Sequence, residues 1–136
     1  MTRFFFILLL FLVACQRGEI NNHKDLDENM MDVRVYHENL GGSVKKGDKE
    51  EALWLLTGMD SLLNVISDKF DKHRKLDKPY RYYYEKDLQP SIGAMRTALE
   101  KGDLGWATSQ YRLLTSKCNG CHEDHDVDKT ILDWSK

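Results

Sequence analysis

The chain has 136 residues, of which 41% are hydrophobic and 31% charged, and its formal net charge at pH 7 is −2. A chain of this length is expected to form one domain with one modest core. The slightly acidic balance argues against nucleic-acid binding, which usually requires a clearly basic stripe or domain.

The N-terminal segment has the pattern of an export signal. Arg3 supplies one positive charge, and an unbroken apolar run follows from Phe4 to Ala14. As a helix this run would span only about 16 Å, roughly half of the apolar core of a bilayer, so a retained transmembrane helix is not expected. Its length is typical of a secretory signal peptide, which we place at residues 1–14.

The apolar run ends in Leu12-Val13-Ala14-Cys15, which resembles the lipobox of bacterial lipoproteins. In that motif the cysteine becomes the lipid-modified first residue of the mature protein, so we expect Cys15 to anchor the protein to a membrane from the periplasm. An ordinary signal peptide that contains a cysteine is the alternative. Gln16 follows Cys15, instead of the Asp associated with inner-membrane retention, and this favours the outer membrane.

The next segment, residues 15–28, is rich in Asn, Asp, Glu and Lys and holds few apolar side chains. This composition predicts a flexible tether between the lipid and the folded domain. We expect the domain to occupy residues 29–126 and a C-terminal tail to occupy residues 127–136.

Four amphipathic helices are predicted in the domain, because apolar residues recur at steps of three and four. Pro90 fits the first turn of the third helix, where its missing N–H has no partner to lose. In chain order the stripes are Met30, Val33, His37, Leu40 and Val44; Leu55, Leu56, Met59, Leu62, Leu63, Ile66 and Phe70, in a helix from about Lys49 to Lys72; Leu88, Ile92, Met95 and Leu99; and Leu104, Ala107, Tyr111, Leu114, Cys118 and Cys121.

Two connections carry the same tripeptide, Lys46-Gly47-Asp48 and Lys101-Gly102-Asp103. Each places a basic residue in a last helical turn, glycine at a left-handed cap and aspartate at the next N-cap. Asp48 and Glu51 also have the spacing of a capping box. Because both connections are short, the helices pair as antiparallel hairpins, and we predict an all-α, up-down-up-down four-helix bundle.

The last predicted helix ends in Cys118-Asn119-Gly120-Cys121-His122, the C-x-x-C-H signature of covalent c-type haem attachment. Two thiols at this spacing can form thioethers with the two vinyl groups of one haem, and the next residue can bind the iron as the proximal ligand. With Cys15, these are the three cysteines of the chain, so none remains for a disulfide. In bacteria c-type haem is attached outside the cytoplasmic membrane, which agrees with the export signal.

The longest predicted connection, Asp71 to Tyr84, joins the second and third helices at the bundle end that holds the haem motif. It is basic and aromatic. Cations pair with haem propionates and aromatic rings cover a porphyrin face, so we expect this connection to lie over the haem edge. A solvated charged loop is the alternative.

A four-helix bundle with C-x-x-C-H in its last helix resembles the class II cytochromes c, the cytochrome c′ family. The resemblance covers roughly residues 29–125 and is most specific from Tyr111 to His122. It implies one covalent haem c held by Cys118 and Cys121, with His122 as the proximal iron ligand. In that family the sixth position of the iron faces the first helix, where some members have an apolar residue and others a Met ligand.

On that helix this chain has His37, which departs from both patterns. A buried imidazole needs partners for its nitrogens, and the neighbours on its stripe offer few, so we expect His37 to be the distal iron ligand. A core histidine is the alternative. Weaker candidates are His73 and His125; Met30, Met31 and Met59 are expected to pack in the core, and His23 lies in the tether, where no role at the iron is expected.

Two functions follow from the state of the sixth position. Two fixed axial ligands favour an electron carrier that serves redox partner proteins of the periplasm. A vacant or labile position favours a protein that binds NO or CO, in a pocket lined by residues such as Val33, Leu40, Leu55 and Met59. Whether the protein forms a homodimer is left open.

Functions that do not involve haem are disfavoured. One helix can hardly place Cys118, Cys121, His122 and His125 around a single zinc ion. A thiol oxidoreductase normally carries its Cys-x-x-Cys pair at the start of a helix after a strand, and no strand is predicted here. We find no convergent nucleophile, base and orienting group and do not expect an enzyme. The contiguous His122-Glu123-Asp124-His125 is expected to form a solvated helix end.

Overall fold

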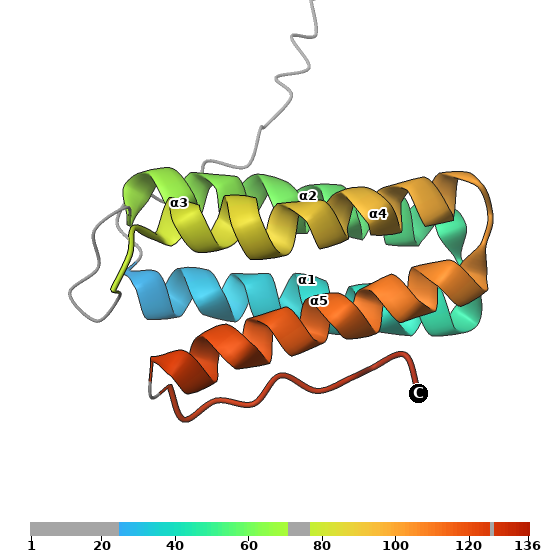
Figure 1. The fold of residues 1–136 in the computed structure, drawn as a ribbon. Coiled ribbons are helices and arrows are strands. Elements are labelled where there is room, and N and C mark those ends of the chain that lie inside the picture. Colours follow the sequence, from blue (N-terminus) through green and yellow to red (C-terminus); the bar gives the residue numbers. More distant parts are fainter. Residues whose placement is uncertain (1–24, 71–76, 126) are drawn as a thin grey trace, which may run out of the picture.

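The computed structural model describes residues 25–70, 77–125 and 127–136, and every structural statement below concerns these residues. They form an up-down-up-down four-helix bundle, and the C-terminal segment runs back along one side of it (Figure 1). The predicted fold class is confirmed. The helical elements are α1 (Leu26–Lys46), α2 (Lys49–Lys69), α3 (Tyr80–Tyr83), the π-helical segment η1 (Tyr84–Leu88), α4 (Gln89–Glu100) and α5 (Leu104–Asp124).

Several predicted features lie outside the described residues: the signal peptide, Cys15, His23, His73 and most of the tether. Within the described residues, none of the helices is both long and apolar enough to cross a membrane.

The core lies between four rods, of which the third combines α3, η1 and α4. Neighbouring pairs are α1 with α2, α2 with α4, α4 with α5, and α5 with α1. Leu104, predicted in the core, is 38% exposed because it is the first residue of α5, at the end of the bundle. Leu62 and Phe70 pack against the core without full burial. The most deeply buried apolar side chains are Leu40, Leu56, Met59, Ile66, Ile92, Met95, Leu99, Tyr111 and Leu114.

The two Lys-Gly-Asp turns have the predicted geometry. Gly47 and Gly102 adopt left-handed φ angles of 76° and 72°. Each glycine and the aspartate after it donate backbone hydrogen bonds to the last turn of the preceding helix, as in a Schellman motif. The Asp48 and Asp103 carboxylates then accept the N–H groups of Glu51 and Trp106. These short caps make the two helical hairpins antiparallel.

The capping boxes differ from the prediction. The backbone N–H of Asp48 is already bound to the Ser43 carbonyl, so Glu51 does not cap it and instead accepts the Ser43 hydroxyl at 2.7 Å. A complete capping box forms at the start of α1, between Asp25 and Glu28. Because of this cap, α1 begins at Leu26, and its first three residues fall in the segment predicted as tether.

The third rod begins earlier than predicted. Tyr80 to Tyr84, expected in a loop, are helical, and they continue through η1 into α4. Within η1 each backbone N–H bonds to the carbonyl five residues earlier, as from Gln89 to Tyr84. This wider turn lies directly before Pro90, whose ring would clash with a carbonyl in a regular helix interior. The predicted connection therefore ends at Pro79.

Candidate haem-binding site

A cavity of about 230 Å³ lies at the bundle end where α1 begins and α5 ends. Its walls come from α1, α2, α3, η1, α5 and the segment after α5. Apolar side chains from three of these elements form much of the wall, namely Leu26, Met30, Val33, Met59, Leu63 and Leu88. Of the four residues predicted to form a pocket, Val33 and Met59 line the cavity, whereas Leu40 and Leu55 are buried in the core.

Cys118, Cys121 and His122 all line this cavity. Residues three and four positions apart share one face of an α-helix, so the C-x-x-C-H spacing on α5 brings the three side chains together. Burial raises the pKa of the Cys118 thiol to about 12 and that of Cys121 to about 11. Both thiols are therefore protonated at neutral pH, which does not suit a nucleophilic or metal-binding thiolate.

The imidazole of His122 is held by one ring nitrogen. Its Nδ1 lies 2.7 Å from the carbonyl oxygen of Lys129, in the segment that follows α5. A carbonyl can only accept a hydrogen bond, so Nδ1 carries a hydrogen, and in the neutral ring the lone pair is then on Nε2. This is the tautomer that an iron ligand bound through Nε2 requires.

His37 is 2% exposed and also lines the cavity. Its partners come from α5 and not from its own stripe, so the iron is not needed to satisfy the ring nitrogens. Nε2 lies 2.8 Å from the Thr115 hydroxyl, and Nδ1 lies 3.1 Å from the Tyr111 hydroxyl. Burial lowers the pKa of His37 from 6.5 to about 4, so the ring is neutral at pH 7. Ligation of iron by His37 stays a prediction, and it would require Nε2 to exchange Thr115 for the metal.

His125 has a more prominent place than the sequence suggested. The sequence predicts a solvated helix end for this residue, but it lines the cavity and packs perpendicular to the ring of Tyr83, with ring centroids 5.2 Å apart. Its Nε2 is buried and has no hydrogen-bond partner. The helical start of the third rod creates this environment, because it brings Tyr83 over the end of α5.

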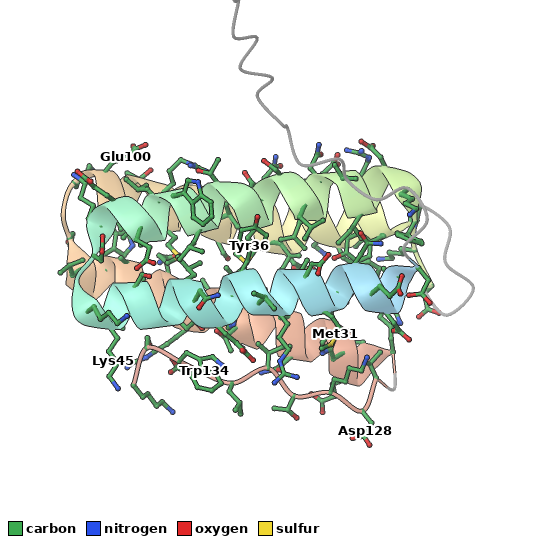
Figure 2. All side chains as sticks on the ribbon, turned by 180° about the vertical axis from the view of Figure 1, so that it is seen from behind. Met31, Tyr36, Lys45, Glu100, Asp128 and Trp134 are labelled. Carbon is green, nitrogen blue, oxygen red and sulfur yellow. The ribbon has the colours of Figure 1, made fainter. Side chains whose placement is uncertain are left out.

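The three methionines that were predicted in the core differ in burial. Met59 is buried as predicted and also lines the cavity. Met30 and Met31 both line the cavity; Met30 is partly buried, whereas Met31, expected in the core, is 48% exposed and visible on the surface of α1 in Figure 2.

The residues at this cavity fit a covalently attached haem. Two protonated thiols and an imidazole whose Nδ1 faces a carbonyl lie on one helix face beside apolar walls. Tyr80 and Tyr83 add aromatic rings, and Lys117 and Lys129 are cations at the same cavity that could pair with propionates. The buried Nε2 of His125 is a polar atom that still lacks a partner.

Within the parts of the chain that the structure describes, no group of three or more His, Cys, Asp or Glu side chains is placed to hold a metal ion by itself. Comparisons with protein-family models, with curated proteins and with solved structures find no match for this chain.

Proposed function

We propose that this protein is a mono-haem c-type cytochrome of the cell envelope that is anchored through a lipid on Cys15 and transfers electrons between periplasmic proteins. The observation that carries the proposal is the shared position of Cys118, Cys121 and His122 at one apolar cavity. The resemblance to class II cytochromes c adds support, because the same bundle with the same motif in its last helix defines that family.

The cysteines and the histidine of the motif have different roles in this proposal. Cys118 and Cys121 would each add one S–H group to a vinyl group, so that the S–H and C=C π bonds are replaced by a C–S bond at one vinyl carbon and a C–H bond at the other. The Nε2 lone pair of His122 would bind the iron. A haem held in this way supplies a one-electron redox centre, while the protein provides position, electrostatics and exclusion of water.

The first test is covalent attachment. The full chain is co-expressed with a c-type haem attachment system, separated by denaturing electrophoresis and stained for haem. The wild type should stain, and the double variant Cys118→Ala/Cys121→Ala should not. Cys15→Ala is the matched control, because it removes a cysteine outside the cavity and should keep the stain. An unstained wild type would contradict the proposal.

Binding of NO or CO is the second candidate function, and one observation favours it. Both ring nitrogens of His37 have protein partners, so His37 has no need of the iron to satisfy its polar atoms. If His37 remains with Thr115 and Tyr111, the sixth position of the iron is free for a gas.

Absorption spectra of the oxidised and reduced protein, with and without CO, separate the two functions. Ligation by His37 gives a low-spin spectrum and slow CO binding, and His37→Ala then gives a high-spin spectrum and fast CO binding. Thr115→Val is the matched variant, since it removes a partner of the imidazole and leaves the ring in place. A wild type that is already high-spin and binds CO rapidly supports the gas-binding function.

A further inference from the structure

The segment after α5 folds back along the bundle instead of leaving it. In Figure 2 it runs beside α1 and α5, from the region of Asp128 to that of Trp134. The backbone N–H of Val127 donates to the His122 carbonyl at 2.8 Å, which begins the reversal. Further along, the Arg112 guanidinium lies 3.2 Å from the Asp133 carboxylate. We call residues 127–136 the C-terminal strap.

Asn119 ties the middle of the strap to α5. Its side-chain oxygen accepts the Ile131 N–H at 2.7 Å, and its side-chain nitrogen donates to the Ile131 carbonyl at 2.9 Å. One amide thus satisfies both backbone groups of a single strap residue. Asn119 lies between the two cysteines in the sequence but does not line the cavity, so this bond pair joins the haem-motif turn of α5 to the strap from outside the cavity.

Two residues before Ile131, the strap contacts His122 directly. The Lys129 carbonyl accepts the Nδ1–H at 2.7 Å. The partner of this ring nitrogen influences which tautomer a ligating histidine adopts, how its ring is oriented and how strongly it donates electrons to the metal. Because the carbonyl belongs to the backbone, its position depends on what holds the strap.

We propose that the C-terminal strap positions the proximal ligand, with Asn119 as the positioning residue that acts through Ile131 and the Lys129 carbonyl on His122. This inference rests on the proposed function only in that His122 binds the haem iron. The strap is held on both sides of Lys129, by the Val127 bond before it and by Asn119 and Arg112 after it.

The strap should lower the midpoint potential of the haem. An Nδ1–H that donates to a fixed carbonyl makes the imidazole a stronger donor, which favours Fe(III) over Fe(II). Loss of such a partner typically changes metal affinity by at least about tenfold. If a tenfold loss falls on Fe(III) and not on Fe(II), the midpoint potential rises by about 59 mV for a one-electron couple.

The test uses the full-length, haem-loaded protein and two variants. Asn119→Ala removes both bonds to Ile131, and a chain that ends at Asp128 removes the Lys129 carbonyl while leaving the haem motif intact. Ser116→Ala, an exposed position on the same helix, is the control. Both strap variants should raise the midpoint potential by about 59 mV, and hydrogen exchange at His122 Nδ1 should become faster, as measured by ¹⁵N NMR. Ser116→Ala should change neither quantity.

Two outcomes overturn different statements. If the haem-loaded variants keep the wild-type potential and the wild-type exchange rate, the strap does not position His122. If the wild type carries no haem, the proposed function fails, and ¹⁵N NMR of the chain without haem still tests the strap. There the Nδ1–H tautomer of His122 should predominate in the wild type and be lost in the truncated chain, and an unchanged tautomer would exclude the strap's role.

Discussion

The imidazole of His37 stacks on the phenol ring of Tyr111, with ring centroids 4.6 Å apart and an angle of 26° between the planes. The Tyr111 hydroxyl lies 3.1 Å from His37 Nδ1 and 3.0 Å from the His37 carbonyl oxygen. When the hydroxyl donates to the carbonyl, Nδ1 carries the ring hydrogen and Nε2 holds the lone pair. When the hydroxyl donates to Nδ1 instead, Nε2 carries the hydrogen and donates to the Thr115 hydroxyl, whose own hydrogen goes to the Tyr111 carbonyl at 2.9 Å. The tautomer of His37 therefore depends on which acceptor the Tyr111 hydroxyl takes.

Burial of His37 should make the protein less stable in mild acid. Its pKa is about 4 in the folded protein, against 6.5 for the free side chain. Between these values the unfolded chain binds a proton that the folded chain excludes, so the free energy of unfolding falls as the pH is lowered from 6.5 to 4. The total loss is about 3 kcal/mol. Urea unfolding of haem-free protein across this range measures it.

His37→Gln is the control for this pH dependence, because glutamine keeps polar atoms at the position and does not titrate. The variant should lose less stability than the wild type over the same pH range, while the carboxylates contribute equally to both. Parallel curves for wild type and variant would show that His37 titrates normally.

Gly41 and Gly42 should respond in opposite ways to alanine. A Cβ at Gly41 would lie 2.6 Å from Tyr111 Cζ and 2.7 Å from Trp134 Cβ, so Gly41→Ala should destabilise the protein by about 1–3 kcal/mol. A Cβ at Gly42 meets no atom within 4 Å, so Gly42→Ala should stabilise the helix by about 0.5–1 kcal/mol. Thermal unfolding measures both, and equal effects would contradict the packing of α5 and the strap against Gly41.

The unpartnered nitrogen of His125 gives a test of its relation to the haem. His125→Phe keeps an aromatic ring beside Tyr83 and removes the buried Nε2, so the haem-free protein should gain about 1–3 kcal/mol of stability. If Nε2 pairs with the haem, the loaded protein should gain nothing or lose stability. Unfolding of both forms provides the comparison, and an equal gain in both would exclude a role for His125 toward the haem.

Membrane attachment through Cys15 is tested by fractionation. Cys15→Ala should move the protein from the membrane to the soluble periplasmic fraction, because each buried CH₂ of a lipid chain contributes about 0.8 kcal/mol to anchoring. The Cys118→Ala/Cys121→Ala double variant should remain in the membrane fraction. Retention of Cys15→Ala in the membrane would show that another segment anchors the chain.

Local chemistry explains which parts of the fold could be predicted. The Lys-Gly-Asp turns depend on a glycine with a left-handed φ angle and on an aspartate whose side chain accepts the backbone N–H three residues later. Both residue types are visible in the sequence. The shared face of Cys118, Cys121 and His122 follows equally from helical spacing.

Contacts between distant segments could not be predicted in the same way. The partners of His37 lie 74 and 78 residues away on α5, and its own stripe gives no indication of them. The bonds of Asn119 to Ile131 depend on a chain reversal for which the sequence has no glycine or proline signal. The sequence also gives too late a start for the third rod, because Pro90 is typical of a first helical turn and the π-helical segment before it has no sequence signal.

The π-helical segment before Pro90 has a consequence for changes in chain length. Tyr80, Tyr84, Leu88 and Ile92 are all buried, although each step of four residues in a regular α-helix overshoots a full turn by about 40°. The wider turn of η1 absorbs this drift and keeps the four side chains on one face. The wider turn holds one residue more than a regular α-helical turn, so deletion of a single exposed residue such as Glu85 would let this stretch become a regular α-helix and keep Tyr80 on the face of Ile92. Insertion of one residue would instead rotate α3 by about 100° relative to α4 and turn Tyr80 and Tyr83 away from the cavity. This stretch should therefore tolerate the loss of one exposed residue but not the insertion of one.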